Sequence, residues 1–266
     1  MLLRSVVLFC ALLPGVAALA ADIQINDRDS GYTLEISGSI KPGDFETLTG
    51  IFKGEGAFPA STRISSVGGN LGEAMRLGKL YRDAHLSAIA VDNCDSACFL
   101  WLLGAVSRTI ATSVSPDLRL PDMTAEIMEY LANMDVPPDV ALDLVASDSA
   151  QAVPFNGDRF ENEIGERPGS YSDWLVQNCG EASEQEHIDH RRIQSAAFLK
   201  VLRQMQAENP ERKDLAPVIA KYEAIEIQVN HISADYRASL LNKWLDIQQC
   251  QRALVKTDQQ RLITGL

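Results

Sequence analysis

Histidine is scarce in this sequence. The four histidines are His85, His187, His190 and His231, so none falls between His85 and His187. This absence matters for any serine in that interval, because a hydroxyl needs a neighbouring base to become a useful nucleophile. Arginine cannot replace that base, since its guanidinium group stays protonated.

Positive charge is also in short supply. The chain has 24 Lys and Arg against 36 Asp and Glu, for a formal net charge of -12. Residues 171–266 are nearly balanced, with 12 basic and 13 acidic residues, so residues 21–170 hold almost all of the excess. An acidic domain repels phosphate backbones, and we therefore expect no nucleic-acid partner.

Long apolar runs are absent except at the start of the chain, MLLRSVVLFCALLPGVAALA. A positive residue near the beginning, Arg4, and an A-x-A end at Ala20 predict a secretory signal peptide. A membrane anchor is the alternative, but Pro14 and Gly15 interrupt the run and shorten it. We therefore expect a periplasmic or secreted protein with no membrane span after signal cleavage.

Cysteines are few, because cleavage of the predicted signal peptide would remove Cys10 and leave four. They are Cys94, Cys98, Cys179 and Cys250. An even number in an oxidising compartment favours disulfides, and spacing suggests one local pair, Cys94–Cys98, and one distant pair, Cys179–Cys250. A zinc site is less favoured, because no histidine lies near the local pair and the spacing is not C-x-x-C. We expect neither a metal nor a cofactor.

Two regions differ in texture. Residues 22–169 mix short strand-like runs, glycines and helical stretches, whereas residues 171–266 have little glycine and long helical periodicity. The stretch GERPGS at residues 165–170 has the composition of a linker. We expect a signal peptide over 1–20, an α/β domain over 21–169, and a helical hairpin or small bundle over 171–266. Its helices are predicted at 182–208, 212–232 and 233–258.

Strand-like and helical segments alternate in the first region. YTLEISGSI, STRISSV and LSAIAV read as strands, and DFETLTGIFK and NLGEAMRLGKLYRDA as helices between them. Asn70, followed three residues later by Glu73, predicts a capping box at the start of the second helix. This order predicts parallel βαβ units. Two further helices are expected over 123–134 and 136–148.

The stretch SSVGG ends one predicted strand and opens a helix. Gly68 and Gly69 would let backbone N–H groups face a ligand oxygen, as in an oxyanion hole or an anion site. The alternative is a tight turn that needs positive φ.

The stretch VDNCDSACFLWLLGA carries a second candidate. Ser96 would lie in the first turn of an apolar, buried helix, where free N–H groups and the helix dipole favour negative charge. The N–H of Ala97 could then donate to an oxyanion, whereas the alternative role for Ser96 is a helix cap. A Cys94–Cys98 bridge would hold this turn rigid, with a Cα separation expected near the upper part of the allowed range.

Together these motifs resemble the ClpP-like branch of the ClpP/crotonase superfamily, in an exported bacterial form with a C-x-S-A-C motif. The resemblance spans roughly residues 30–165 and rests on residues 66–69, Gly78, residues 94–98, Gly104 and Arg108. It implies a spiral of ββα units. It also implies that Ser96 occupies the nucleophile position, with Gly68 or Gly69 and Ala97 as oxyanion donors.

The sequence departs from that family where the base should be. RTIATSVSPDLRLPDM has no histidine, and Arg119 or Leu120 stands nearest the expected place; Val67 also replaces a proline. The only nearby lysine, Lys79, is expected to point to solvent. His187 and His190 are expected to be solvated on a helix of the second region.

Three functional expectations follow. The first is a degenerate serine-peptidase fold used to bind or scaffold a peptide or protein, with Arg119 holding a carboxylate. The second is a serine hydrolase with Ser96 as nucleophile and a base from the C-terminal helices or another subunit. The third treats the first domain as a platform, with the helical unit making the functional contact, including contact within a homo-oligomer.

Overall fold

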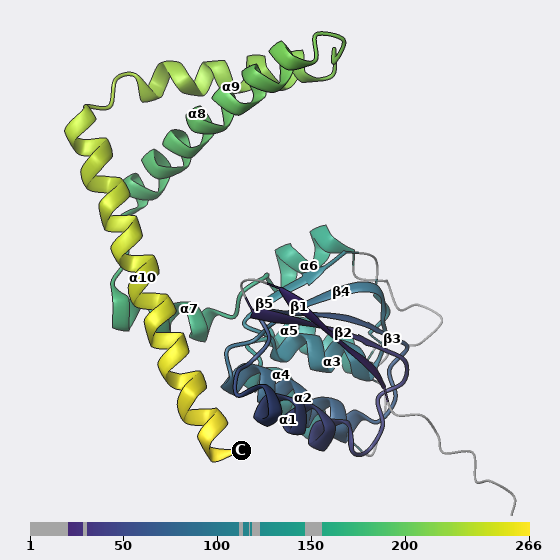
Figure 1. Ribbon diagram of the computed structural model, residues 1–266. Helices are drawn as coiled ribbons and strands as arrows, with labels where there is room; N and C mark the ends of the chain where they lie inside the picture. Colours follow the sequence, from purple (N-terminus) through teal and green to yellow (C-terminus); the bar gives the residue numbers. More distant parts are fainter. Residues whose placement is uncertain (1–20, 29–30, 112–113, 117, 119–122, 147–155) are drawn as a thin grey trace, which may run out of the picture. The chain divides into compact units, whose positions relative to one another are not determined.

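The chain divides into two units, called here the sheet unit, Met1–Glu166, and the helical unit, Arg167–Leu266. The computed structural model describes residues 21–28, 31–111, 114–116, 118, 123–146 and 156–266 (Figure 1). The predicted signal peptide therefore lies outside the described residues.

A five-stranded sheet forms the centre of the sheet unit. Its strands, in spatial order, are β1 (Asp22–Arg28), β2 (Gly31–Ser37), β3 (Ser61–Ser66), β4 (Ser87–Cys94) and β5 (Ser107–Ile110). β1 pairs antiparallel with β2, and the other pairs are parallel. The predicted parallel order is confirmed for β2 to β4, whereas the sequence patterns did not predict β1 or β5.

Three helices connect the parallel strands and cover one face of the sheet (Figure 1): α1 (Asp44–Glu55), α2 (Leu71–Asp83) and α3 (Ala97–Gly104). Alternate strand residues such as Leu34, Ile64 and Ala90 are buried against them. α3 is buried at every position, as expected for a helix that is apolar all round. At the carboxyl ends of β2, β3 and β4 the chain therefore turns into a helix.

Two glycines bring α2 and α3 into close contact. A Cβ atom on Gly104 would overlap the backbone of Gly78, and one on Gly78 would overlap the hydroxyl of Tyr130. That hydroxyl donates to the carbonyl of Leu100 over 2.6 Å. Because the backbones of Gly78 and Gly104 are in direct contact, they fix the distance at which α3 packs against α2.

Three further helices complete the sheet unit: α4 (Thr124–Asn133), α5 (Pro138–Ala146) and α6 (Gly157–Glu163). The two helices predicted over 123–134 and 136–148 correspond to α4 and α5. α6 was not predicted, because seven residues with one large apolar side chain, Phe160, are too few to show a clear period.

The helical unit contains four helices: α7 (Gly169–Cys179), α8 (Glu184–Glu208), α9 (Leu215–Val229) and α10 (Ala234–Gly265). α8 and α9 form a hairpin around Leu199, Leu202, Leu215 and Ile219. The prediction of three helices missed α7 and ended the last helix too early. The predicted fold class, α/β followed by a helical unit, is confirmed.

A disulfide joins Cys179 at the end of α7 to Cys250 on α10, with Cα atoms 5.7 Å apart. The distant pairing expected from spacing is therefore present. None of the described helices is both long enough and apolar enough to cross a bilayer.

Candidate functional site

Ser96 lies at the turn between the end of β4 and the start of α3. Its backbone has φ 50° and ψ -119°. Residues other than glycine rarely adopt this conformation, which costs about 1–3 kcal/mol of free energy. Ser96 holds the N-cap position rather than the first helical turn. Its side chain makes no capping hydrogen bond, so the capping alternative is wrong.

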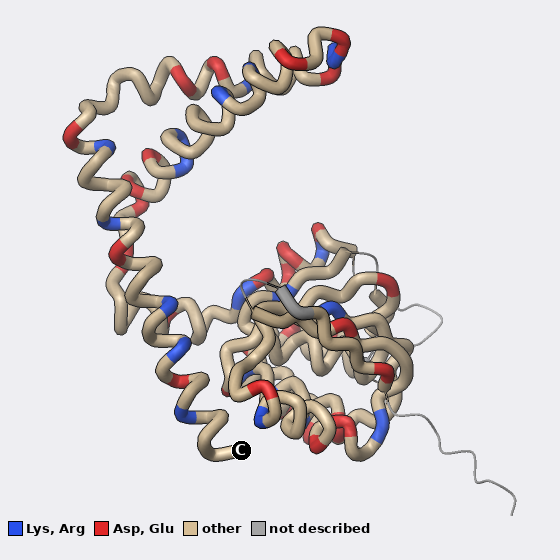
Figure 2. The backbone as a smooth tube through the Cα atoms, in the orientation of Figure 1, with Lys and Arg blue, Asp and Glu red and all other residues tan. Residues whose placement is uncertain are grey.

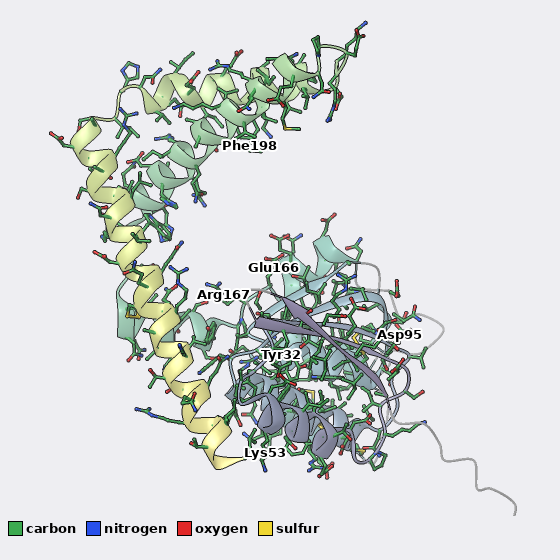
Figure 3. All side chains as sticks on the ribbon, viewed as in Figure 1. Tyr32, Lys53, Asp95, Glu166, Arg167 and Phe198 are labelled. Atoms are coloured by element: carbon green, nitrogen blue, oxygen red, sulfur yellow. A yellow bond between two sulfur atoms is a disulfide. The ribbon has the colours of Figure 1, made fainter. Side chains whose placement is uncertain are left out.

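Three hydrogen bonds hold this strained turn, two between backbone groups and one to the Asp95 side chain. The Ser96 N–H donates to the Ser115 carbonyl at 3.1 Å, and the Ser115 N–H donates to Asp95 Oδ1 at 2.7 Å. On the other side, the Asp95 N–H donates to the Ser66 carbonyl at 3.1 Å. Figure 3 labels Asp95 at this end of the sheet. The turn is thus fixed between the end of β3 and the segment after β5.

A disulfide between Cys94 and Cys98 closes the same turn. Cys94 ends β4 and Cys98 is the second residue of α3, and both are fully buried. The local pairing is present, but the Cα separation of 4.9 Å lies in the lower part of the allowed range rather than the upper. The reason is that the bridge spans a sharp strand-to-helix turn and not one turn of a helix.

The two glycines of the neighbouring turn have left-handed backbones, with φ 93° at Gly68 and 145° at Gly69. A Cβ atom on Gly68 would lie 2.7 Å from the Asp95 carbonyl oxygen and 3.1 Å from the Ala97 nitrogen. The glycine turn therefore packs directly on the Ser96 turn. The positive φ values agree with the tight-turn interpretation, and the oxyanion role stays a prediction.

The backbone donors at these turns differ in what they bind. The Gly68 N–H donates to Ser66 Oγ at 3.1 Å and is therefore not free to bind a ligand. Within the described part of the chain, the N–H groups of Gly69 and Ala97 donate to no protein acceptor. Ala97 is fully buried, where an unpaired N–H group is costly, whereas Gly69 is exposed and its N–H group can be solvated.

A segment that the sequence analysis did not connect to the site supports the glycine turn. Ile40 forms a parallel bridge with Gly69. The Ile40 N–H donates to the Gly68 carbonyl, and the Asn70 N–H donates to the Ile40 carbonyl, both at 2.9 Å. Ile40 precedes α1, far from the motif in sequence, and only the fold brings it there.

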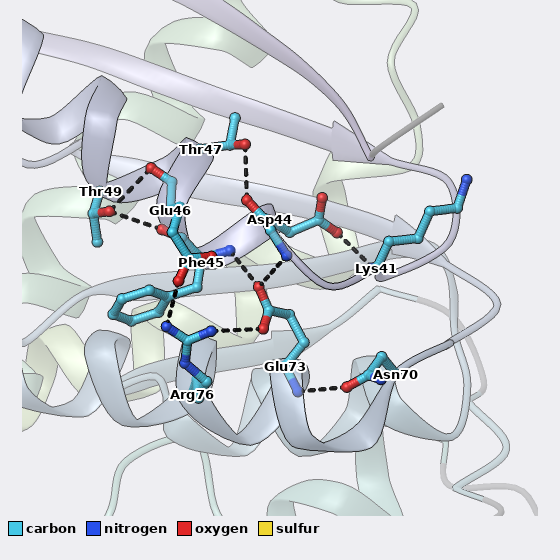
Figure 4. A network of polar contacts seen from close by, with 10 residues as sticks. Lys41, Asp44, Phe45, Glu46, Thr47, Thr49, Asn70, Glu73 and Arg76 are labelled. Atoms are coloured by element: carbon cyan, nitrogen blue, oxygen red, sulfur yellow. Dashed lines mark hydrogen bonds and ion pairs between the residues drawn. The ribbon is translucent and has the colours of Figure 1, made fainter. Parts of the chain in front are cut away.

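Glu73 anchors this support (Figure 4). Its Oε1 accepts the N–H groups of Gly43 and Phe45, at 3.0 and 2.7 Å, and its Oε2 meets Arg76 at 3.0 Å. The Asn70 side chain accepts the Glu73 N–H as predicted. The capping box is nonetheless only half formed, because the Glu73 carboxylate binds the start of α1 instead of the Asn70 backbone.

Arg108, one of the residues behind the family resemblance, is completely buried and structural. Its guanidinium donates to four backbone carbonyls, those of Leu103, Met134, Ile164 and Gly165, at 2.8 to 3.2 Å. Burial, with a smaller contribution from the nearby Arg82 charge, lowers the pKa of Arg108 to about 10. The clamp holds the end of α3 opposite to Ser96.

Lys79 and His85 are the lysine and the histidine nearest to Ser96 in the sequence. Lys79 is 72% exposed and pairs with Asp83 at 3.6 Å, as expected for a solvent-facing lysine. His85 precedes β4, whereas Ser96 follows it, so the strand separates them by about 23 Å. The Ser96 hydroxyl makes no hydrogen bond with the described residues.

His187 and His190 are not the solvated residues that were expected. Both contact the Trp244 indole in the helical unit, with ring centroids 4.9 and 4.2 Å apart, and His190 is buried. Burial, followed by the His187 charge, lowers the pKa of His190. These rings pack α8 against α10, which gives them a structural role.

Arg119 lies outside the described residues, so its predicted contact with a carboxylate stays a prediction. The structure offers another cation, Arg63, in a hollow of about 190 Å³ over the carboxyl ends of β2, β3 and β4. Arg63 pairs with Glu35 across the strands at 3.5 Å. Its position on the outer face follows from the alternation in STRISSV, a signal the sequence analysis left unused. Among the described residues, no cluster of His, Cys, Asp or Glu could hold a metal ion.

Among known proteins, the chain is similar to several solved structures. No family model and no curated protein matches the chain. A mutant of the membrane-bound stomatin-specific protease 1510-N is similar with 14% identity and a TM-score of 0.39, covering 55% of this chain and 83% of that one. A putative enoyl-CoA hydratase/isomerase from Bordetella parapertussis has 15% identity and a TM-score of 0.38, covering 89% and 95%. Methylmalonyl-CoA decarboxylase has 10% identity and a TM-score of 0.41, covering 88% and 95%.

Proposed function

We propose that the sheet unit is a ClpP-like fold used for binding, and that it holds a carbonyl or carboxylate oxygen of a peptide. The observation that carries this proposal is the pair of N–H groups at Gly69 and Ala97, which have no acceptor among the described residues. They belong to two turns in direct contact, one of them at the start of a buried helix. Such N–H groups favour an oxygen with negative charge.

The absence of a base supports binding over catalysis. Lys79 is committed to Asp83, and His85 lies at the other end of β4. His187 and His190 pack on Trp244 within their own unit. A serine hydroxyl without a base attacks a carbonyl carbon poorly, so a bound carbonyl group is held rather than attacked.

A serine hydrolase is the second candidate, and the backbone of Ser96 favours it. Strained φ and ψ values cluster at functional sites, because the surrounding structure must hold them in place. Here three hydrogen bonds and a disulfide do so, while the hydroxyl is left without a capping role. In this alternative the base comes from another subunit or from the helical unit.

A fluorophosphonate probe separates the two candidates. For a binding protein we expect no covalent labelling of the purified chain from pH 6 to 9, measured as intact mass. Labelling that persists in Ser107→Ala, a matched exposed serine, but disappears in Ser96→Ala would instead establish the hydrolase. Labelling that survives both substitutions would report an unrelated serine and leave the binding proposal in place.

Binding itself is testable by amide NMR. Acetyl-Ala-Ala with a free carboxylate should shift the Gly69 and Ala97 N–H resonances, and its C-terminal amide should shift them less, because the negative oxygen is the better acceptor. Val67, 62% exposed beside Gly68, should broaden with the same ligand. Equal, small shifts with both compounds would remove the proposed oxygen site.

Export is part of the proposal. The Arg4-to-Ala20 leader and the two disulfides are what supports it, since disulfides persist in oxidising compartments. The mature protein, recovered from a periplasmic extract, should begin at Ala21. Recovery of the uncleaved chain in the cytoplasm would contradict export.

A further inference from the structure

Large apolar side chains lie exposed along one stripe of α8. Phe198 is 46% exposed, Val201 51% and Met205 37%, and Phe198 is labelled on this helix in Figure 3. Their spacing of three and then four residues is the heptad spacing of a coiled-coil seam. Exposed apolar side chains at such a spacing mark an interaction surface.

The same spacing continues in both directions along α8. Arg191 and Gln194 precede the apolar residues and Glu208 follows them, and all three are exposed. The six residues define the α8 seam: Arg191, Gln194, Phe198, Val201, Met205 and Glu208. The seam therefore has a positive charge at its N-terminal end, apolar side chains in its middle and a negative charge at its C-terminal end.

The seam lies beside the contact that α8 makes with α9, and one seam residue, Phe198, also packs on Tyr222 of α9. The hairpin core uses Leu199 and Leu202 of α8. On another side of α8, Arg203 pairs with Glu223 and Glu226 of α9 at 3.1 and 3.0 Å. Charges also gather at the turn between the two helices (Figure 2). Within the hairpin, the seam is thus the apolar flank that α9 leaves exposed.

The α8 seam is complementary to itself in one orientation. If two copies pair antiparallel about a two-fold axis between positions 199 and 200, Arg191 stands opposite Glu208 of the second copy. Gln194 then faces Met205, and Phe198 faces Val201. A parallel arrangement would instead place Arg191 against Arg191 and Glu208 against Glu208. The pairing of opposite charges and the pairing of apolar side chains thus favour the same antiparallel register.

We infer that a second copy of this chain occupies the α8 seam, antiparallel and related by a two-fold axis. The seam from Arg191 to Glu208 is about 26 Å long at the helical rise. Val218 of α9, 38% exposed, and Tyr222, which contacts Phe198 at 5.4 Å between ring centroids, extend the surface beside it. Two hairpins paired in this way form a four-helix bundle. This inference does not depend on the oxygen site proposed above.

Sedimentation equilibrium of the purified chain tests the pairing. We expect a dimer at micromolar concentration that becomes a monomer in Val201→Asp, because the substitution buries a charge at the centre of the seam. Ile227→Asp is the matched control, since Ile227 is 64% exposed on the same hairpin but outside the seam, and it should remain a dimer. A monomeric wild-type chain, or a dimer that survives Val201→Asp, would overturn the inference.

Charge reversal tests the register. Arg191→Glu and Glu208→Arg should each weaken dimerisation about tenfold, because each creates two like-charge contacts in a two-fold pair. The double reversal should restore the wild-type dissociation constant. Failure of the double variant to recover would exclude the antiparallel register.

A crosslink gives an independent measure of orientation. The variant with both Arg191→Cys and Glu208→Cys should form inter-chain disulfides on mild oxidation, whereas Arg191→Cys alone should not. Crosslinking by the single variant would indicate parallel pairing and contradict the inference. Binding of the chain to anionic phospholipid vesicles as a monomer, lost in Val201→Asp, would show that a lipid surface rather than a second copy covers the seam.

Discussion

Gly68 lies directly against Ser96: a Cβ atom on the glycine would be 3.1 Å from Ser96 Cβ. Two turns that are separated in sequence by helix α2 and strand β4 therefore meet with their backbones in contact. The absence of a side chain at position 68 is what allows the two turns to approach this closely. The consequences of this contact can be measured one residue at a time.

Replacing Gly68 tests the contact directly. Gly68→Ala adds a Cβ atom 2.7 Å from the Asp95 carbonyl at a φ of 93°, so we expect about 2 kcal/mol or more of lost stability. Gly72→Ala is the matched control, since a Cβ atom there meets only Asn70 Oδ1 at 3.5 Å in a helix that favours alanine. Urea unfolding should show a loss for the first variant and no loss for the second. Equal stability of both would mean that the two turns are not in contact.

The two disulfides should differ in what their removal changes. In the chain-entropy model, the bridge with a separation of 4 contributes about 2 kcal/mol and the bridge with a separation of 71 about 4 kcal/mol. Cys94→Ala with Cys98→Ala should nonetheless lose most binding of acetyl-Ala-Ala, because the Ser96 turn loosens. Cys179→Ala with Cys250→Ala should be less stable but bind as before. The reverse pattern in calorimetry would contradict a positioning role for the short bridge.

Much of the site was predictable where its cause is local. Positive φ at Gly68 and Gly69, the cap by Asn70 and the Cys94–Cys98 pairing all follow from residue type and spacing. The buried α3 follows from its composition. Each of these features is decided by interactions within a few residues along the chain, which is what a sequence pattern records.

The features that failed are set by distant partners. Ser96 is strained rather than helical because Ser115, after β5, accepts its N–H. The Glu73 side chain does not complete the capping box, because its carboxylate accepts two N–H groups at the start of α1 instead. His190 is buried because α10 brings Trp244 over it. None of these partners is marked by a local pattern.

Arg108 offers a test of how α3 is held. Arg108→Met should cost about 3 kcal/mol, because four buried carbonyls lose their charged donor while the apolar stem is kept. Arg63→Met, at a side chain that is 48% exposed and paired with Glu35, should cost less than about 1 kcal/mol. Thermal unfolding of the two variants provides the comparison. A small loss in Arg108→Met would show that the clamp is dispensable.

The helical unit should lose stability in mild acid through His190. Its pKa is lowered in the folded chain by burial and by the His187 charge, so the unfolded chain binds the proton more readily. Stability that depends on neutral His190 is therefore present above the ordinary histidine value of about 6.5 and is lost as the pH falls through the lowered folded value. Trp244 fluorescence during urea unfolding at pH 7 and pH 5 should report this loss. His190→Gln should reduce the pH dependence, and His231→Gln, at an exposed histidine, should not; identical pH dependence in all three chains would assign the acid sensitivity to another group.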